Sequence, residues 1–150
     1  MNEEDISKYC KSRKLQYLTD SEGSFVLGFE STIIVLEVLT FESYQVLSVT
    51  GRCKDDLGLE LLPNAQEYAI YWNRARRWPK ASIDSDGSLR LESDFPLGKE
   101  YSGPCVEFWL DVQLSSVVEA SKEWALVRLF DVKADEMETL GASFQSNERS

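Results

Sequence analysis

Apolar residues recur along the chain at two spacings, which predict an alternation of helices and strands. A helical spacing fills residues 3–14, 62–78 and 104–128. Shorter strand-like runs cover residues 15–19, 24–29, 32–39, 44–52, 80–83 and 88–92. The predicted order is therefore a helix, three or four strands, a second helix, a β-hairpin and a long third helix.

The run Thr32–Leu39 is rich in β-branched residues and nearly continuous in its apolar character. Strands of this kind are usually covered on both faces. We therefore expect a central strand, or at least one that is buried on much of both faces. Two glycines mark predicted turns elsewhere: Gly23 can take the left-handed conformation, and Asp86-Gly87 favours a type I′ turn, whose two central residues both have positive φ.

Capping residues and prolines set the expected limits of the helices. Asn2 is an N-cap candidate for the first helix, because acidic residues fill the turn that follows it. Asn64, with Glu67 three residues later, fits a capping box for the second helix, which Pro79 must end. Pro104 suits the first turn of the third helix.

At 150 residues the chain can form one domain around a single core. We place this domain at residues 1–130, followed by a partly disordered extension at residues 131–150. Residues 131–140 can form one more short helix, whereas residues 141–150 are polar and lack a periodic apolar face. The formal charge of −10, from 26 acidic and 16 basic residues, opposes binding to nucleic acid or to an anionic membrane. The acidic N-terminus and the lack of a long apolar run predict a cytoplasmic protein.

The chain contains no histidine, so it lacks the usual general base and the usual zinc ligand. We expect no catalytic residue, no metal and no cofactor, and an enzyme of this composition would have to use carboxylates, Lys, Tyr or Cys. Cys10, Cys53 and Cys105 are odd in number and far apart, which predicts free thiols. Cys105, in the first turn of a predicted helix, is the best candidate for a reactive thiol, although a buried structural thiol is the more common case.

Positive charge is concentrated at one place in this acidic chain, at the end of the second predicted helix. Arginines there can receive an acidic segment of a partner or a phosphate through planar, bidentate donors. The simpler interpretation is a solvated helix face. Adjacent aromatic residues on the same helix point to different faces, so one of them can leave the core. The candidate partner-binding residues are Tyr71, Arg74, Arg76, Arg77 and Lys80.

Three further patterns have structural explanations that we favour over functional ones. The stretch Asp84–Gly87 resembles the middle of a calcium-binding loop, but the carboxylates at the first and last ligand positions are missing, so a hairpin turn is preferred. Asn73 more often bonds nearby backbone than a ligand. Aromatic residues at helical spacing more often fill a core than line a pocket. This applies to Trp72, Trp78, Trp109 and Trp124.

The most specific stretch of the sequence reads Tyr71-Trp72-Asn73-x-x-x-x-Trp78-Pro79-Lys80-Ala81-Ser82-Ile83-Asp84-x-Asp86-Gly87-x-Leu89-x-Leu91-Glu92-x-Asp94-Phe95-Pro96-Leu97. It resembles the YbjN family of bacterial proteins, in which an aromatic-Asn pair on a helix precedes a basic-Ala strand, an Asp-Gly turn and an acidic-apolar strand. The likeness covers residues 6–124. The sequence departs from the family pattern at Trp78-Pro79, where an aromatic-Gly exit is more usual, and after Asp131.

This resemblance implies the α+β fold of type III secretion chaperones. In that fold a curved antiparallel sheet of about five or six strands packs against three α-helices on one face, in the order α-β-β-β-(β)-α-β-β-α. Proteins of this kind are often dimeric. Family members are described as sensory or regulatory, or as secretion-chaperone-like, and no catalytic residue comes with the match.

We therefore expect a non-catalytic protein-interaction module with a chaperone-like or regulatory role, which binds a protein segment and forms a homodimer. The alternative is a small-molecule-binding or carboxylate-based enzymatic domain, in which acids around the sheet act with Arg74 or Arg77. A deep pocket holding two carboxylates in unequal environments would favour the alternative. A filled core with a shallow groove would favour the module.

Overall fold

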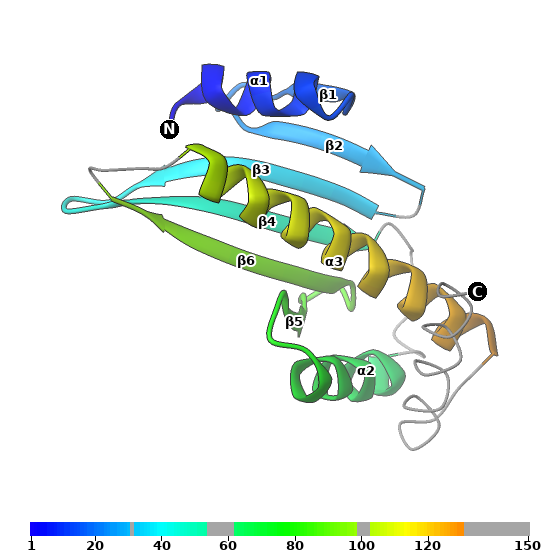
Figure 1. The fold of residues 1–150 in the computed structure, drawn as a ribbon. Helices are drawn as coiled ribbons and strands as arrows, with labels where there is room; N and C mark the ends of the chain where they lie inside the picture. The colour runs from blue at the N-terminus through cyan, green and yellow to red at the C-terminus, as the bar shows by residue number, and fades with distance from the viewer. Residues whose placement is uncertain (31, 54–61, 99–102, 131–150) are drawn as a thin grey trace.

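The computed structural model describes residues 1–30, 32–53, 62–98 and 103–130 (Figure 1). Its strands are β1 (Tyr17–Thr19), β2 (Phe25–Phe29), β3 (Thr32–Thr40), β4 (Gln45–Cys53), β5 (Lys80–Ile83) and β6 (Leu89–Leu97). Its helices are α1 (Glu3–Ser12), α2 (Leu62–Ala75) and α3 (Gly103–Phe130). The strands form one antiparallel sheet in the order β1-β2-β3-β4-β6-β5. The expected α+β class and the order of the elements are confirmed.

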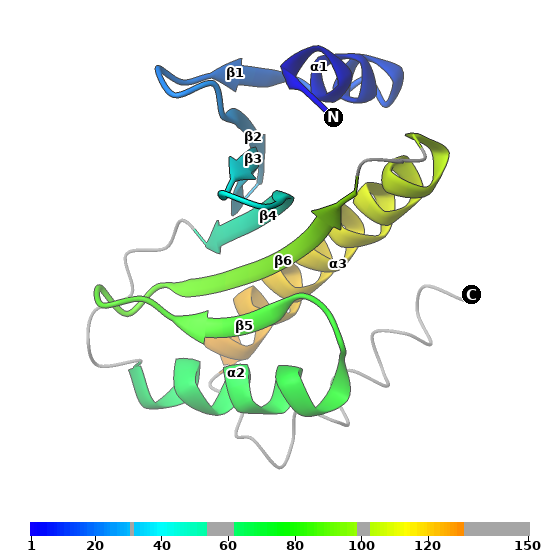
Figure 2. The ribbon, with the colours of Figure 1, turned by 90° about the vertical axis from the view of Figure 1, so that its left-hand side faces the viewer.

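The three helices bury their apolar side chains on one face of the sheet. In Figures 1 and 2, α3 crosses the sheet, α1 lies at its β1 end and α2 lies at its β5 end. Alternate residues of each strand face these helices, as the two-residue period of a strand requires. The largest fully buried side chains are Trp72, Trp124, Tyr9, Tyr68, Ile6, Leu27, Ile34, Leu36, Leu47, Leu89, Leu91 and Leu110.

Strand β3 is central, as expected, and one of its two faces is largely buried. Ile34 and Leu36 are fully buried under the helices, whereas Ile33 and Leu39 keep 38% and 36% of their surface exposed. The reason is that the described helices lie on one face of the sheet only (Figure 2). The outward-facing apolar residues of β3 are therefore not fully buried by any described residue.

Two hairpins are closed by the same local sequence, which reads Asp-Ser-acid-Gly-Ser at residues 20–24 and at residues 84–88. In each, the glycine N–H donates to the carbonyl of the first aspartate, and that aspartate's N–H donates to the carbonyl of the last serine. Gly23 and Gly87 both have φ of +85°. The type I′ prediction for Asp86-Gly87 is wrong, because Lys14 is the one non-glycine residue of the described chain with positive φ. A three-residue loop with glycine in the left-handed position explains both turns.

The element limits are mostly those expected, with two corrections. Asn2 caps α1 in a capping box with Asp5. The capping box proposed for Asn64 is wrong, because α2 already begins at Leu62 and Asn64 lies in its first turn. Strand β6 continues to Leu97, five residues beyond the predicted end, because its side chains go on alternating toward the core.

Helix α2 is fixed to the outer edge of the sheet by two side chains of the sequence motif. The side-chain oxygen of Asn73 accepts the N–H of Ala81 at 2.8 Å, and its side-chain nitrogen donates to the carbonyl of Ala81 at 2.9 Å. The indole N–H of Trp72 donates to the carbonyl of Pro79 at 2.8 Å. Asn73 thus pairs with the free edge of β5 as a neighbouring strand would. The expectation that Asn73 bonds backbone is confirmed.

We predict that Asn73→Ala lowers the free energy of unfolding by about 1–2 kcal/mol, because two half-buried hydrogen bonds at the edge of β5 are lost. Urea-induced unfolding measures this change. The control is Arg74→Ala at the adjacent exposed position, for which we expect a change within about 0.5 kcal/mol. Equal stability of the Asn73 variant and the wild type would contradict this role for Asn73.

Candidate partner-binding surface

The five candidate residues do not share one helix face. Tyr71 and Arg74 lie on α2, Arg76 and Arg77 follow its end at Ala75, and Lys80 is the first residue of β5. The expectation of an Arg-rich helix face is therefore replaced by a helix end, a connecting loop and a strand start. All five lie where α2 turns into the sheet.

Two of the five are occupied within the protein. Arg76 forms an ion pair of 2.7 Å with Glu119 of α3, and its guanidinium lies 5.6 Å from the centre of the Trp72 ring. Tyr71 is half-buried and packs against the core, with its ring 6.2 Å from that of Tyr68. Arg76 therefore connects the end of α2 to α3, and both side chains have structural roles.

The other three remain available at the surface. Arg74, Arg77 and Lys80 are exposed and form no ion pair with any residue that the structure describes. Two large apolar side chains accompany them: Ile70 is 57% exposed and Trp78 is 52% exposed. We call these residues, Ile70, Arg74, Arg77, Trp78 and Lys80, the α2–β5 patch.

Sequence reasoning missed Ile70 and assigned Trp78 to the core. Trp72 and Trp124 are indeed fully buried, and Trp109 is half-buried against Phe95 with ring centres 5.2 Å apart. Trp78 differs because it follows the end of α2 and no longer shares the helix's buried face. Ile70 was detectable in the sequence, since it lies off the stripe that carries Tyr68 and Trp72.

The composition of the α2–β5 patch matches a segment that carries both carboxylates and apolar side chains. Arg supplies paired donors in a planar fork that fits a carboxylate. Exposed Trp and Ile supply apolar contact area, and Trp is among the residues most often found at the energetic centre of interfaces. The patch can therefore combine charge recognition with burial of apolar surface.

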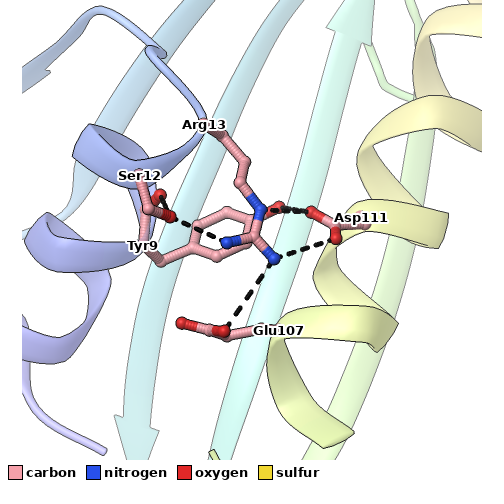
Figure 3. A network of polar contacts seen from close by, with 5 residues as sticks. All are labelled: Tyr9, Ser12, Arg13, Glu107 and Asp111. Atoms are coloured by element: carbon pink, nitrogen blue, oxygen red, sulfur yellow. Dashed lines mark hydrogen bonds and ion pairs between the residues drawn. The ribbon is translucent and has the colours of Figure 1, made fainter. Parts of the chain in front are cut away.

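A second polar cluster joins α1 to α3 (Figure 3), and three of its residues, Tyr9, Arg13 and Asp111, also line a groove. The Arg13 guanidinium donates to both carboxylate oxygens of Asp111, at 3.1 and 3.0 Å, and lies 3.8 Å from Glu107. The Tyr9 hydroxyl donates to Asp111 at 2.7 Å. The hydrogen bonds from Arg13 hold the pKa of Asp111 below its usual value. This cluster fixes α1 on α3.

The groove beside this cluster has a volume of about 720 Å³, and its apolar lining includes Leu15, Phe29, Leu114 and Val118. Two carboxylates line it, Asp111 and Glu119, and each is paired with an arginine. Eight residues separate them along α3, so their Cα atoms lie about 12 Å apart along the helix axis. Neither Arg74 nor Arg77 lines the groove. The arginines that the enzymatic alternative requires beside the carboxylates are therefore not located there.

The thiols and the Asp84–Gly87 loop do not form a further site among the described residues, although Cys105 is exposed and not the buried structural thiol that was favoured for it. Cys10 and Cys53 are buried and Cys105 is exposed, all three as free thiols. Asp84 pairs with Arg52 and Arg90, as in a hairpin turn and not a calcium loop. Within the described ranges, no three Cys, Asp or Glu residues cluster as metal ligands. None of the described helices is both long and apolar enough to span a membrane.

One carboxyl group is buried beneath the α2–α3 contact. Glu123 is 4% exposed, and burial together with repulsion from Glu119 raises its pKa from 4.5 to about 7 against the opposing effect of the Arg76 charge. Its Oε1 oxygen has no hydrogen-bond partner among the described residues. At pH 8 this contact therefore holds a charge that burial disfavours.

Comparison with known proteins gives a family and a fold. Residues 2–124 match the sequence model of YbjN, described as "Putative bacterial sensory transduction regulator". No match was found among curated proteins. The crystal structure of YbjN from E. coli, described as "a putative transcription regulator", matches with a TM-score of 0.65 at 9% identity, over 85% of this chain and 94% of that chain. At this identity the structural likeness shows the fold alone.

We predict that the free energy of unfolding falls as the pH rises from about 4.5 to about 7, because the folded state holds the proton of Glu123 more tightly than the unfolded state does. Glu123→Gln removes this dependence. The free energy of unfolding of the variant, measured relative to that of the wild type, should therefore rise by up to about 3 kcal/mol between pH 4 and pH 8. Chemical unfolding across this pH range measures the difference. Glu67→Gln, at an exposed position of α2, is the control and should keep the wild-type pH profile. A Glu123→Gln profile parallel to the wild type would refute the assignment.

Proposed function

The chain belongs to the YbjN family, and on that premise we propose that it is a bacterial regulatory protein that acts by binding a segment of another protein, without catalysing a reaction. The family description supports the regulatory role. The binding of a protein segment is supported by the surface chemistry described above. The expected chaperone-like role rests on fold likeness and stays a prediction, as does the expected cytoplasmic location.

The site that we propose for this binding is the α2–β5 patch. The observation that carries the proposal is that residues 70–80 hold three exposed cations without an ion-pair partner in the described chain, together with two large exposed apolar side chains. Exposed apolar residues grouped with Arg and Trp are typical of interaction sites. The segment that fits would carry Asp or Glu together with a large apolar side chain.

The net charge of the chain restricts how such a segment can approach. The protein carries −10 overall, so an extended acidic partner would be repelled by most of its surface. Interactions between exposed charges are screened beyond about 8 Å at physiological ionic strength. A short acidic segment can therefore be attracted locally by Arg74 and Arg77 with little repulsion from distant acids. This favours a linear motif over a large acidic surface.

Binding of a small molecule remains the second candidate, and the groove between α1 and α3 supports it. Its volume of about 720 Å³ lies within the range of known ligand pockets. The two candidates use different surfaces, because no residue of the α2–β5 patch lines this groove. Variants of the patch therefore distinguish between them.

We predict that Arg74→Glu/Arg77→Glu weakens binding of acidic, apolar peptides at least about tenfold, which corresponds to about 1.4 kcal/mol. The probe is an array of synthetic peptides that combine Asp or Glu with Leu or Phe, read by fluorescence anisotropy with the full chain. Trp78→Ala should weaken the same peptides, because apolar contact is lost.

The matched control is Lys8→Glu/Lys11→Glu on exposed positions of α1. Both double variants replace two positive charges by two negative ones, so both change the net charge from −10 to −14. We expect the control to bind within about twofold of the wild type. Equal losses in the two double variants, or no binding of any peptide by the wild type, would argue against the α2–β5 patch.

A further inference from the structure

The groove between α1 and α3 adjoins a smaller hollow. The hollow has a volume of about 120 Å³ and lies against α3, where β2 ends and β3 begins. Three residues, Phe29, Val118 and Lys122, line both spaces, so one small molecule can occupy them together. The residues that line the hollow are Phe29, Glu30, Thr32, Val118, Ser121 and Lys122.

The hollow holds one acid and one base that form no ion pair within the described chain. The two carboxylates that line the larger groove are each paired with an arginine. Glu30 and Lys122, in contrast, are exposed and form no ion pair with each other or with any other residue that the structure describes. One negative and one positive charge are therefore available to a ligand that carries both.

Two buried hydroxyl groups line the same hollow. Thr32 on β3 and Ser121 on α3 are 1% and 3% exposed, and their hydroxyls are hydrogen-bonded to each other. A hydroxyl has one donor and two acceptor lone pairs, so the Thr32 oxygen keeps the capacity to accept a further hydrogen bond. The hollow is therefore polar, whereas much of the lining of the adjoining groove is apolar.

The sizes of the two spaces suit a ligand with a small polar head and a larger apolar body. A volume of about 120 Å³ corresponds to about four water molecules at roughly 30 Å³ each, so the hollow has room only for a small head group. The groove, at about 720 Å³, offers Leu15, Phe29, Leu114 and Val118 to the body. Ligand sites usually combine an apolar lining with a few polar groups in this way.

We propose that the hollow and the groove together bind an α-amino acid with a large apolar side chain. Its carboxylate pairs with Lys122, its ammonium group pairs with Glu30, and its side chain lies in the groove. Such a ligand is neutral overall, so the charge of −10 on the chain does not repel it as it would repel a simple anion. The proposal rests on small-molecule binding, the second candidate function, and it does not involve the α2–β5 patch.

The test compares L-phenylalanine with two analogues that each lack one charge. L-phenylalaninamide has no carboxylate, and N-acetyl-L-phenylalanine has no ammonium group. Isothermal titration calorimetry with the full chain measures the three affinities. We expect L-phenylalanine to bind, and each analogue to bind at least about threefold more weakly, because each analogue loses one ion pair with an exposed side chain.

Because the analogues also differ in net charge, conservative variants are needed to assign each charge to its residue. Lys122→Gln should remove the preference for L-phenylalanine over its amide, and Glu30→Gln should remove its preference over the N-acetyl analogue. Ser115→Trp, at an exposed position that lines the groove, should weaken all three ligands by filling the space of the apolar body. The matched controls are Lys11→Gln and Glu67→Gln, at exposed positions outside both spaces, which should keep the wild-type preferences.

Absence of saturable binding of L-phenylalanine to the wild type, or unchanged preferences in the Lys122 and Glu30 variants, would overturn the proposal. If the wild type binds the apolar probe anilinonaphthalene sulfonate in a way that Ser115→Trp abolishes, but does not bind L-phenylalanine, the groove is a small-molecule site and the amino-acid class is wrong. Arg74→Glu/Arg77→Glu should bind L-phenylalanine as the wild type does. Failure of the proposed peptide binding is therefore distinguishable from failure of this inference.

Discussion

The packing of α3 on the inner face of the sheet is the contact on which the other elements depend. It needs Gly51 on β4, because a Cβ atom there would lie 2.5 Å from a methyl group of Val117 on α3, closer than atoms can approach. Helix α1 is then fixed to α3 through Asp111, and α2 is fixed to it through the Tyr68–Trp124 ring contact at 5.3 Å. Removal of α3 would leave both shorter helices without their partner.

The sequence predicted the elements because most of them depend on local chemistry. The two Asp-Ser-acid-Gly-Ser loops turn because glycine can take positive φ, and α1 begins at Asn2 because its side chain accepts an N–H of the first turn. The turn type at Asp86-Gly87 was predicted wrongly because an Asp-Gly dipeptide occurs both in a two-residue type I′ turn and in a three-residue loop that ends in a left-handed glycine. The structure distinguishes them by the conformation of Asp86, which the dipeptide alone does not determine.

The candidate site was predicted less completely, because its composition depends on contacts between distant residues. Arg76 and Glu119 are 43 residues apart in sequence, and no local pattern shows that this arginine is already paired. The exposure of Trp78 likewise depends on where α2 ends and how the chain enters β5. The basic cluster itself was visible, but only the fold separates Arg74, Arg77 and Lys80 from the arginine with a structural role. For the same reason, the strong apolar pattern of β3 indicated a central strand, but it did not show that Ile33 and Leu39 stay partly exposed among the described residues.

The α2–β5 patch would combine two contributions that are each weak alone. Exposed ion pairs contribute only about 0–1 kcal/mol each, so its cations alone would hold an acidic segment weakly. Ile70 and Trp78, which are 57% and 52% exposed, would add apolar contact area, and burial of apolar surface is the main favourable contribution in most protein–protein association. A segment would therefore need both a carboxylate and a large apolar side chain to bind well, which is a physical basis for selecting a partner without catalysis.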